Sequence, residues 1–340
     1  MAILITWGLG YIWSHTAVVF ANAGYDVVIV DNLSNTDVGV LEKINKLIAK
    51  PVSFYECDLR DKLALSAVFQ KHTIDAVIHF AWYKSVWDSC AHPFLYYDNN
   101  IGGGNTLYAV MQEYGVRTIV FSSSCAIYDS IHNTLPYDEN ASLKTINPYA
   151  STKLMSEIIL HDLSMYLGFQ TIALRYFNII GAHPSGLLWD NPRWVPDNVL
   201  PYLYGVLLGS YEHLNIWWND YPTPDGTGVR DYIHVMDLAE AHLSAYEVLK
   251  DGGMKKMDDG MWVFDVINLW TWRWTSVMEL VQLTEKITWK QLPYKIWPRR
   301  SGDAASVYAD PSKSHRVLWW KATRTVEDAI RDGWNFTQSL

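Results

Sequence analysis

Residues 2–15 of the chain are AILITWGLGYIWSH. The opening apolar run is typical of a buried strand, and Gly8 and Gly10 permit a tight turn before a helix. In that order of strand, turn and helix, the pyrophosphate of a dinucleotide binds at the helix N-terminus, where unpaired backbone N–H groups and the helix dipole favour negative charge. The stretch therefore predicts a dinucleotide-binding α/β fold, although Trp7 and Trp13 occupy positions where such a turn normally needs glycine.

The composition narrows the class of protein. A length of 340 residues corresponds to about two domains. No stretch reaches the roughly 18 consecutive apolar residues of a membrane span, and the N-terminus lacks the order of a signal peptide. Cys57, Cys90 and Cys125 have no metal-site spacing and cannot all pair with one another, which favours a reducing compartment. With a net charge of -9 and no basic stripe, we expect a soluble cytoplasmic protein without nucleic-acid or membrane partners.

Apolar β-rich runs alternate with segments of three- and four-residue apolar spacing through the first half of the chain. Strands are expected at 2–6, 26–31, 52–56, 76–80, 118–122 and 171–176, and helices at 15–23, 38–48, 63–71, 98–114 and 148–163. Gly24 and Gly115 lie where helix C-caps are expected. The alternation predicts an α/β fold with a Rossmann-like, doubly wound parallel sheet.

The pattern changes after about residue 178. Residues 181–201 are dense in Pro, Gly, Asn and Asp, which is typical of a surface loop at the carboxyl ends of strands, and we interpret them as a substrate-binding insertion. A strand and helix pattern at 231–249 is expected to return to the sheet. The sequence thus predicts an NAD-binding domain at 1–178, with a return segment at about 231–267, and a smaller C-terminal substrate-binding lobe formed by 179–230 and 268–340.

Two acidic residues are candidates for binding the cofactor. Asp31 ends the second expected strand, where a carboxylate accepts hydrogen bonds from the adenosine ribose and repels a 2′-phosphate, so that NAD is favoured over NADP. A plain turn at the strand end is the alternative role. Asp58 follows the third strand and is expected at the adenine edge or, equally, as a helix cap.

Tyr149 and Lys153 are the strongest catalytic candidates. Four residues apart on a helix, they share one face, and an ammonium near a phenol lowers the phenol pKa from its usual value of about 10. Tyr149 would then act as a base near neutral pH. Such a pair also arises by chance in helices, but Pro148 marks a helix start and Ser124 ends the serine run at 122–124, where we expect it to relay a proton rather than only to form a turn.

A set of motifs along the chain carries a resemblance to a known family. They are the Tyr149-x-x-x-Lys153 pair and the stretches 98–100 (DNN), 122–124 (SSS), 175–178 (RYFN), 181–186 (GAHPSG), 219–235 (NDYPTPDGTGVRDYIHV) and 298–303 (PRRSGD). With them the chain resembles the UDP-glucose 4-epimerases, a family of extended short-chain dehydrogenase/reductases, over nearly its whole length.

The resemblance implies an NAD-dependent epimerase that interconverts UDP-galactose and UDP-glucose. Tyr149, helped by Ser124, would take the proton of the sugar 4-hydroxyl while a hydride passes from C4 to NAD; the 4-keto sugar would turn over and receive the hydride on its other face. The implied cofactor-binding residues are Gly10, Tyr11, Ile12, Asp31, Asn32, Asp58, Leu59, Phe80, Lys84, Asn99, Ser122, Tyr149, Lys153 and Phe177. The implied substrate-binding residues are Ser124, Tyr149, Asn178, Asn198, Arg230, Arg300 and Asp303.

The same resemblance implies a homodimer that pairs through helices 98–114 and 148–163. The small side chain of Val307, if it lines the sugar pocket, would leave room for a 2-N-acetyl group. Two alternatives stay open. One is another NAD-dependent nucleotide-sugar enzyme, a dehydratase or decarboxylase, against which the uncharged Cys125 and Ala126 argue because elimination of water needs an acidic pair. The other is a catalytically silent binding protein with a blocked cofactor site.

Tryptophan is over-represented at turns. The family pattern has glycine where this chain has Trp at positions 7, 13, 82, 87, 218, 270, 272, 274 and 319, and Asp129 replaces another glycine. An aromatic-rich core would follow a helix or strand period instead. Repetition of a single replacement indicates a deliberate alteration or an erroneous residue assignment rather than drift. Overpacking costs about 1–3 kcal/mol per site against a total stability of about 5–15 kcal/mol, so the literal chain is expected to bind NAD poorly or to fail to fold.

Overall fold

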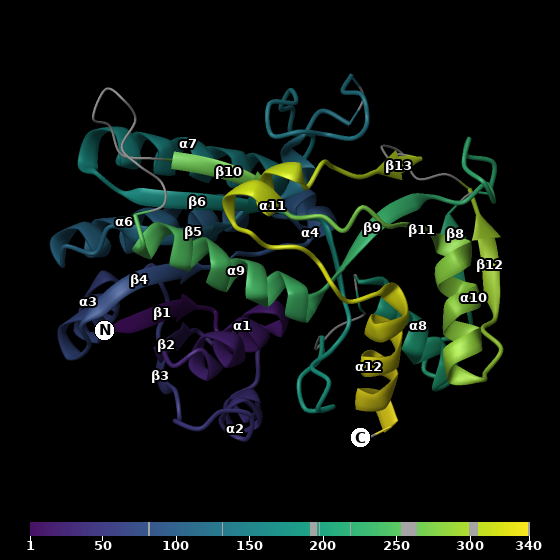
Figure 1. Ribbon diagram of the computed structural model, residues 1–340, viewed down its shortest axis with the longest axis horizontal. Helices are drawn as coiled ribbons and strands as arrows, with labels where there is room; N and C mark the ends of the chain where they lie inside the picture. The colour runs from purple at the N-terminus through teal and green to yellow at the C-terminus, as the bar shows by residue number, and fades with distance from the viewer. Residues whose placement is uncertain are drawn as a thin grey trace.

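A seven-stranded parallel sheet forms the larger part of the molecule (Figure 1). The computed structural model describes residues 1–80, 82–130, 132–190, 196, 198–217, 219–252, 264–298 and 305–338. The strands are β1 (Ala2–Thr6), β2 (Asp26–Asp31), β3 (Ser53–Glu56), β4 (Ile74–His79), β5 (Thr118–Ser122), β6 (Gln170–Arg175) and β10 (Phe264–Asn268), in the order β10-β6-β5-β4-β1-β2-β3. This order reverses at β1 and β4, as in a doubly wound sheet, and the expected α/β fold is confirmed.

Helices cover both faces of the sheet. Because side chains alternate along a strand, Ile3 and Ile5 of β1 pack with α1 (Tyr11–Asn22) and α9 (Val235–Lys250) on one face. Ala2 and Leu4 pack on the other face with α3 (Lys62–Lys71), α6 (Gly103–Glu113) and α7 (Pro148–Leu167). The inner strands, such as β1 with all five residues buried, are therefore covered on both sides, whereas the edge strand β3 (Ser53–Glu56) is only partly buried.

Local signals fix the ends of these helices. Asn147 caps α7 through a hydrogen bond from the Ala150 N–H, and Pro148 occupies the first helical position. The same helix ends at Gly168, whose φ of 72° lies in the left-handed region that favours glycine. The remaining elements of the larger part are α2 (Gly39–Asn45), α4 (Val86–Ala91), α5 (Pro93–Tyr96), the π-helix η1 (Tyr97–Gly102), the 3₁₀ turn η2 (Cys125–Ile127) and α11 (Ser312–Val317).

A smaller lobe lies beside the carboxyl edge of the sheet (Figure 1). Its strands are β7 (Asn178–Ile180), β9 (Val229–His234), β11 (Trp274–Ser276) and β13 (Ser306–Val307) in one sheet, and β8 (Leu214–Trp217) with β12 (Tyr294–Trp297) in another. The helices are α8 (Val199–Leu207), α10 (Val277–Thr288) and α12 (Val326–Gln338), packed around a separate apolar core that includes Leu203, Leu280 and Ile330.

One expectation about the topology is wrong. The strand expected at the start of 231–249 does not return to the large sheet; β9 pairs with β7, β11 and β13 in the small lobe. The strand that joins the large sheet is β10, which pairs with β6 from Phe264 to Asn268. An apolar run predicts that a strand forms, but it does not predict which sheet the strand joins. Strand β9 forms its backbone hydrogen bonds with β7, β11 and β13, which are all strands of the small lobe.

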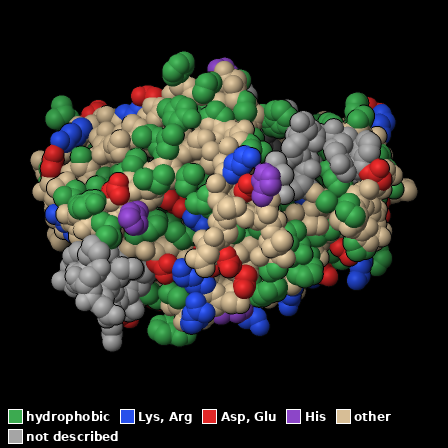
Figure 2. Space-filling view, turned by 90° about the horizontal axis from the view of Figure 1, so that it is seen from above, with side chains coloured by type: hydrophobic (Ala, Val, Ile, Leu, Met, Phe, Trp, Pro, Cys, Tyr) green, Lys and Arg blue, Asp and Glu red, His purple; other side chains and the backbone are tan. Residues whose placement is uncertain are grey.

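The surface seen in Figure 2 carries acidic and basic side chains side by side. Among the described helices, none combines the length and the apolar character needed to cross a membrane.

Candidate functional site

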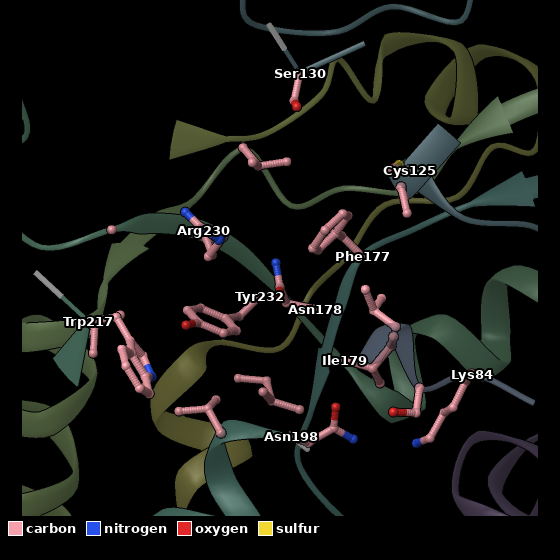
Figure 3. A pocket seen from close by; sticks show the side chains of 18 of the residues that line it. Lys84, Cys125, Ser130, Phe177, Asn178, Ile179, Asn198, Trp217, Arg230 and Tyr232 are labelled. Atoms are coloured by element: carbon pink, nitrogen blue, oxygen red, sulfur yellow. The ribbon is translucent and has the colours of Figure 1, made fainter. Parts of the chain in front are cut away.

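A cavity of about 770 Å³ opens between the carboxyl edge of the large sheet and the small lobe. This volume is within the range of small-molecule sites. Figure 3 shows Lys84 and Cys125, from the larger part, on one side of the space and Trp217 and Arg230, from the small lobe, on the other. Both parts of the chain are therefore needed to form the cavity.

Three of the residues expected to bind substrate line this cavity: Asn178, Asn198 and Arg230. Asn178 donates to the backbone oxygen of Asp231 at 3.3 Å, and Asn198 Nδ2 lies 2.5 Å from Asp190 Oδ2. Arg230 Nη1 donates to the backbone oxygen of Val229 at 2.9 Å, which directs the guanidinium along the wall of the cavity. Arg300 and Asp303 lie outside the described residues.

The aromatic and aliphatic lining complements these polar groups. Phe177, Val307 and Lys84 line the same cavity. The roles expected for them, as cofactor contacts for Phe177 and Lys84 and as a sugar contact for Val307, stay predictions. Sequence reasoning missed Tyr202, Asn215 and Trp217, which line the small-lobe side. Only their position around a cavity identifies them, since none belongs to a motif.

Tyr149 and Ser124 are brought together beside the cavity. The two hydroxyl groups are hydrogen-bonded, and Ser124 Oγ also accepts the Ala126 N–H at 3.1 Å. Cys125, Ala126 and Asn147, which flank these residues in sequence, line the cavity. The pair therefore lies directly behind the residues that line the cavity.

Lys153 does not act on Tyr149 as the spacing predicts. Its Nζ donates to the backbone oxygen of Ser122 at 2.5 Å and lies 4.5 Å from the centre of the Trp82 ring, against 5.9 Å from the Tyr149 ring. Burial holds the pKa of Lys153 well below its usual value, opposed by Glu157. Burial also raises the pKa of Tyr149, so the expected lowering of that pKa is wrong for this chain.

The cause of this correction is Trp82, at a position where the family pattern has glycine. Its side chain is 1% exposed, and its Nε1 has no hydrogen-bond partner among the described residues. An ammonium near an indole face is attracted to it. Trp82 therefore holds Lys153 away from Tyr149 together with the Phe121 ring, whose centre lies 5.1 Å from Nζ, and the backbone oxygen of Ser122.

The glycine turn at residues 7–13 is filled by its own side chains. A Cβ atom at Gly10 would lie 2.0 Å from Cε3 of Trp13, so the Trp13 ring packs directly against this glycine and fills the space that its missing side chain leaves open. Trp7 is buried, and its ring centre lies 5.4 Å from that of Trp13 and 5.5 Å from that of Tyr83. Phe80 closes the cluster at 6.0 Å from Trp13. As these residues stand, the turn does not fit a dinucleotide.

Asp31 lies at the end of β2, as expected, but its oxygens are already engaged. They accept hydrogen bonds from Leu9 N at 3.2 Å, Leu33 N at 2.9 Å and Thr36 Oγ1 at 2.8 Å. The carboxylate is almost wholly buried, and burial raises its pKa. Its role toward a ribose stays a prediction.

The other expected cofactor residues surround the same edge of the sheet. Asp58 pairs with Arg60 at 2.7 Å, which lowers the pKa of Asp58 to about 2, and accepts from Asn32 at 3.2 Å. Asn99 is buried in the π-helix η1, an element frequent at functional sites. Tyr11 donates to the Gly181 oxygen at 2.6 Å, whereas Ile12 and Leu59 pack into the two cores.

A buried ion pair that the sequence did not indicate lies beneath the catalytic candidates. Arg175 donates to Glu157 at 2.6 Å, and Ser123 also donates to that carboxylate. Ser122 shares a hydrogen bond with the Tyr176 hydroxyl. Glu157 lies one helical turn after Lys153, which is the only signal that could have suggested this support.

The remaining glycine replacements lie in varied places. Trp87 is exposed on α4 and lines the cavity, Trp270 is buried, and Trp274 stacks on Tyr308 at 4.4 Å. Trp272 and Trp319 are exposed, with φ of 61° and 48°. Asp129 is buried beside His132. Position 218 lies outside the described residues.

Comparisons with known proteins are consistent across the chain. Residues 3–257 match the NAD dependent epimerase/dehydratase family. The chain is 46% identical to the UDP-glucose 4-epimerase of Bacillus subtilis (strain 168), covering 100% of this chain and 97% of that protein. It is 44% identical to the UDP-glucose 4-epimerase of Dictyostelium discoideum, covering 99% and 96%.

Solved structures extend the likeness to three dimensions. The UDP-glucose-4-epimerase of Stenotrophomonas maltophila, with bound NAD and formylated UDP-arabinopyranose, has a TM-score of 0.93 and 41% identity, covering 100% of this chain and 98% of that one. The UDP-glucose 4-epimerase of Bifidobacterium longum, in complex with NAD+ and UDP, has a TM-score of 0.90 and 40% identity, with the same coverage.

Proposed function

Since this chain belongs to the NAD dependent epimerase/dehydratase family, we infer that it is a UDP-glucose 4-epimerase, which interconverts UDP-galactose and UDP-glucose. The observation that carries this function is the cavity, which brings Asn178, Asn198 and Arg230 together with the residues that flank Ser124 and Tyr149. NAD is the cofactor of this reaction, and it supplies the acceptor and donor of a hydride at the sugar C4.

The small lobe binds the uridine diphosphate. Arg230 suits this task because the guanidinium fork matches phosphate oxygens. Asn178 and Asn198 provide neutral amide groups for the nucleotide, and Arg300 and Asp303 complete the set by their place in the motif. The bound nucleotide thereby positions the sugar at the carboxyl edge of the large sheet.

Tyr149 holds and moves the proton of the sugar 4-hydroxyl. Burial raises the phenol pKa, and the hydrogen bond to Ser124 opposes part of that rise. Proton transfer by a positioned group contributes about 10²–10⁴-fold to a rate. Ser124 relays the proton. Lys153 lies against Trp82 in this chain, so it would support Tyr149 only in a protein with glycine at position 82.

The uncharged wall of the cavity disfavours dehydratase or decarboxylase chemistry. Cys125 and Ala126 stand beside the proposed proton relay, and burial raises the pKa of the Cys125 thiol. A neutral thiol and a methyl group cannot supply the acidic pair that elimination of water needs. The lining by Val307 supports acceptance of a 2-N-acetyl group, which an assay with UDP-N-acetylglucosamine showing no turnover would reject.

The enzyme acts in the cytoplasm as a homodimer that pairs through η1, α6 and α7. Met155 and Ile158, 41% and 54% exposed on α7, support this assignment because they are apolar side chains left uncovered on that helix. A single monomeric species in sedimentation velocity would contradict it.

The epimerase function is tested with the protein that carries glycine at positions 7, 13 and 82. UDP-galactose is added without cofactor, UDP-glucose is measured, and Tyr149→Phe is assayed in parallel. We expect turnover by the former and a loss of about 10²–10⁴-fold in the latter. Absence of turnover in protein shown to contain NAD would overturn the epimerase function.

A further inference from the structure

Tryptophan occupies backbone positions that suit glycine. Among the described residues, five residues other than glycine have a positive φ, and four of them are Trp7, Trp272, Trp289 and Trp319, with φ between 48° and 61°. The fifth is Leu33. The left-handed region is open to glycine because it has no Cβ atom, whereas a bulky residue there is an outlier. Since only 17 of the 340 residues are Trp, chance does not explain the set.

The chain itself provides a direct comparison at the ends of two helices. Helix α7 ends at Gly168 with φ 72° and ψ 28°. Helix α10 ends at Trp289 with φ 56° and ψ 27°, and the indole is 91% exposed, so it gains nothing from packing. The two residues do the same task, for which glycine is the usual choice. The motifs did not single out position 289; its backbone does.

A similar need for glycine holds at position 272. The turn 271–273 wraps around the buried Asp231, which accepts hydrogen bonds from the Thr271 N–H and from the backbone of Trp272. The chain must turn sharply for two successive N–H groups to reach one carboxylate. The Trp272 side chain takes no part and is left exposed.

An independent observation comes from the catalytic edge of the sheet. Trp13 covers Gly10, and Trp82 holds Lys153 with an unpartnered Nε1 among the described residues. Both rings lie where the glycine turn and the Tyr149–Lys153 pair need free space. Trp320 is different, because its Nε1 donates to the Asp237 oxygen at 3.0 Å and its ring is buried. Some tryptophans therefore fit their places and others do not.

We propose that the polypeptide that functions in the cell carries glycine at positions 7, 13, 82, 272, 289 and 319, and tryptophan at 320. With glycine at 7, 13 and 82 the site fits NAD and Lys153 is released toward Tyr149. Backbone geometry and packing support the assignment of glycine at these positions. The expectation that the glycine form binds NAD rests in addition on the proposed function.

The direct test is peptide mass spectrometry of the protein isolated from its own organism. We expect peptides with glycine at the six positions and with tryptophan at 320. Tryptophan at any of the six positions would overturn the assignment. This result does not depend on whether the protein is an epimerase.

The consequence for the cofactor is tested with two purified forms of the full chain. One carries Trp at 7, 13 and 82, and the other carries Trp7→Gly, Trp13→Gly and Trp82→Gly. We expect the glycine form to release NAD on denaturation and the Trp form to release at least about tenfold less. Binding of UDP by both forms shows that each is folded, because the cavity lies outside these positions. Equal NAD content in two folded forms would overturn the consequence.

Discussion

The ammonium of Lys153 lies 4.5 Å from the centre of the Trp82 ring, closer than to the ring of Tyr149 at 5.9 Å. An aromatic face competes with a phenol for the same cation, and the indole is the better partner. Replacing Trp82 by glycine removes the nearest ring, while the Phe121 ring at 5.1 Å and the Ser122 oxygen at 2.5 Å remain. We expect Lys153 then to be more available to stabilise the Tyr149 phenolate.

We therefore expect Trp82→Gly to lower the pKa at which activity rises. The pKa of Tyr149 is raised by burial while Lys153 is held away, and the base form of a phenol gains population as pH increases. The pH profile of kcat should move toward lower pH when residue 82 is glycine. The comparison is made with glycine at positions 7 and 13 in both forms, and an unchanged profile would show that Trp82 does not control the lysine.

Tyr149→Phe should remove turnover and preserve binding. The substitution deletes the hydroxyl that is bonded to Ser124 but leaves Arg230 and Asn178, which line the cavity, untouched. Calorimetry with UDP should give the same affinity for both forms, while epimerisation falls by about 10²–10⁴-fold. A large loss of UDP affinity would assign Tyr149 to binding instead of proton transfer.

Arg230→Ala should weaken UDP binding by about 10–100-fold, as expected for a charge-assisted contact of about 1.5–3 kcal/mol. Arg230→Lys should restore only part of the affinity, because an ammonium cannot bind two phosphate oxygens in one plane. Arg331→Ala is the matched control, since Arg331 is paired with Asp328 on α12. Equal effects at positions 230 and 331 would indicate a general charge effect.

The large sheet was predictable because its strands are apolar on both faces and nothing else in the first half of the chain competes for them. The sheet that strand β9 joins was not predictable, because its sequence pattern fits an edge of either sheet. Only its pairing with β7 and β11 in the folded protein shows that it belongs to the small lobe. The π-helix around Asn99 also escaped prediction, since its sequence has ordinary helical spacing.

Within the candidate site, the motifs predicted which residues would lie near one another, but they did not predict the contacts that these residues make. Asn178, Asn198 and Arg230 do line one cavity. The direction of Lys153 depends on Trp82, which lies far away in the sequence, and the Glu157–Arg175 pair depends on two elements that meet only after folding. Such contacts become visible only when the strands and helices have been placed in space.

Asp231 should make the folded protein more stable as pH falls from neutrality. Burial raises its pKa to about 6, against a usual value of about 3.8, so the folded state binds a proton that the unfolded state does not bind between those values. The stability from this group is present below pH 3.8 and lost as pH rises through about 6. Urea unfolding of the parent and of Asp231→Asn should show the parent gaining about 1 kcal/mol relative to the variant between pH 7 and pH 5.

The sign of this effect makes the test decisive. An Asn side chain at position 231 keeps an oxygen that accepts the Thr271 hydrogen bonds. It does not titrate, so the Asp231→Asn variant is the control for the pH dependence. A stability difference that is constant with pH, or that moves in the other direction, would show that Asp231 remains ionised in the folded protein.

Trp289→Gly and Trp319→Gly should each stabilise the protein. Both residues have positive φ, 56° and 48°, and side chains that are 91% and 83% exposed. A non-glycine residue with a backbone in this region destabilises the folded state by about 1–2 kcal/mol. Replacing it by glycine removes this strain, but the greater conformational freedom of glycine stabilises the unfolded chain and offsets part of the gain. We expect a net increase of up to about 1 kcal/mol in the free energy of unfolding at each position.

Trp87→Gly is the matched control for these two substitutions, since Trp87 is 67% exposed but lies within the helix α4. Glycine inside a helix is less favourable than most residues by a few tenths of a kcal/mol to about 1 kcal/mol. The control should therefore lose stability where the other two gain it. If all three substitutions change the urea midpoint in the same direction, the effect comes from removing an exposed indole, and the backbone at 289 and 319 does not require glycine.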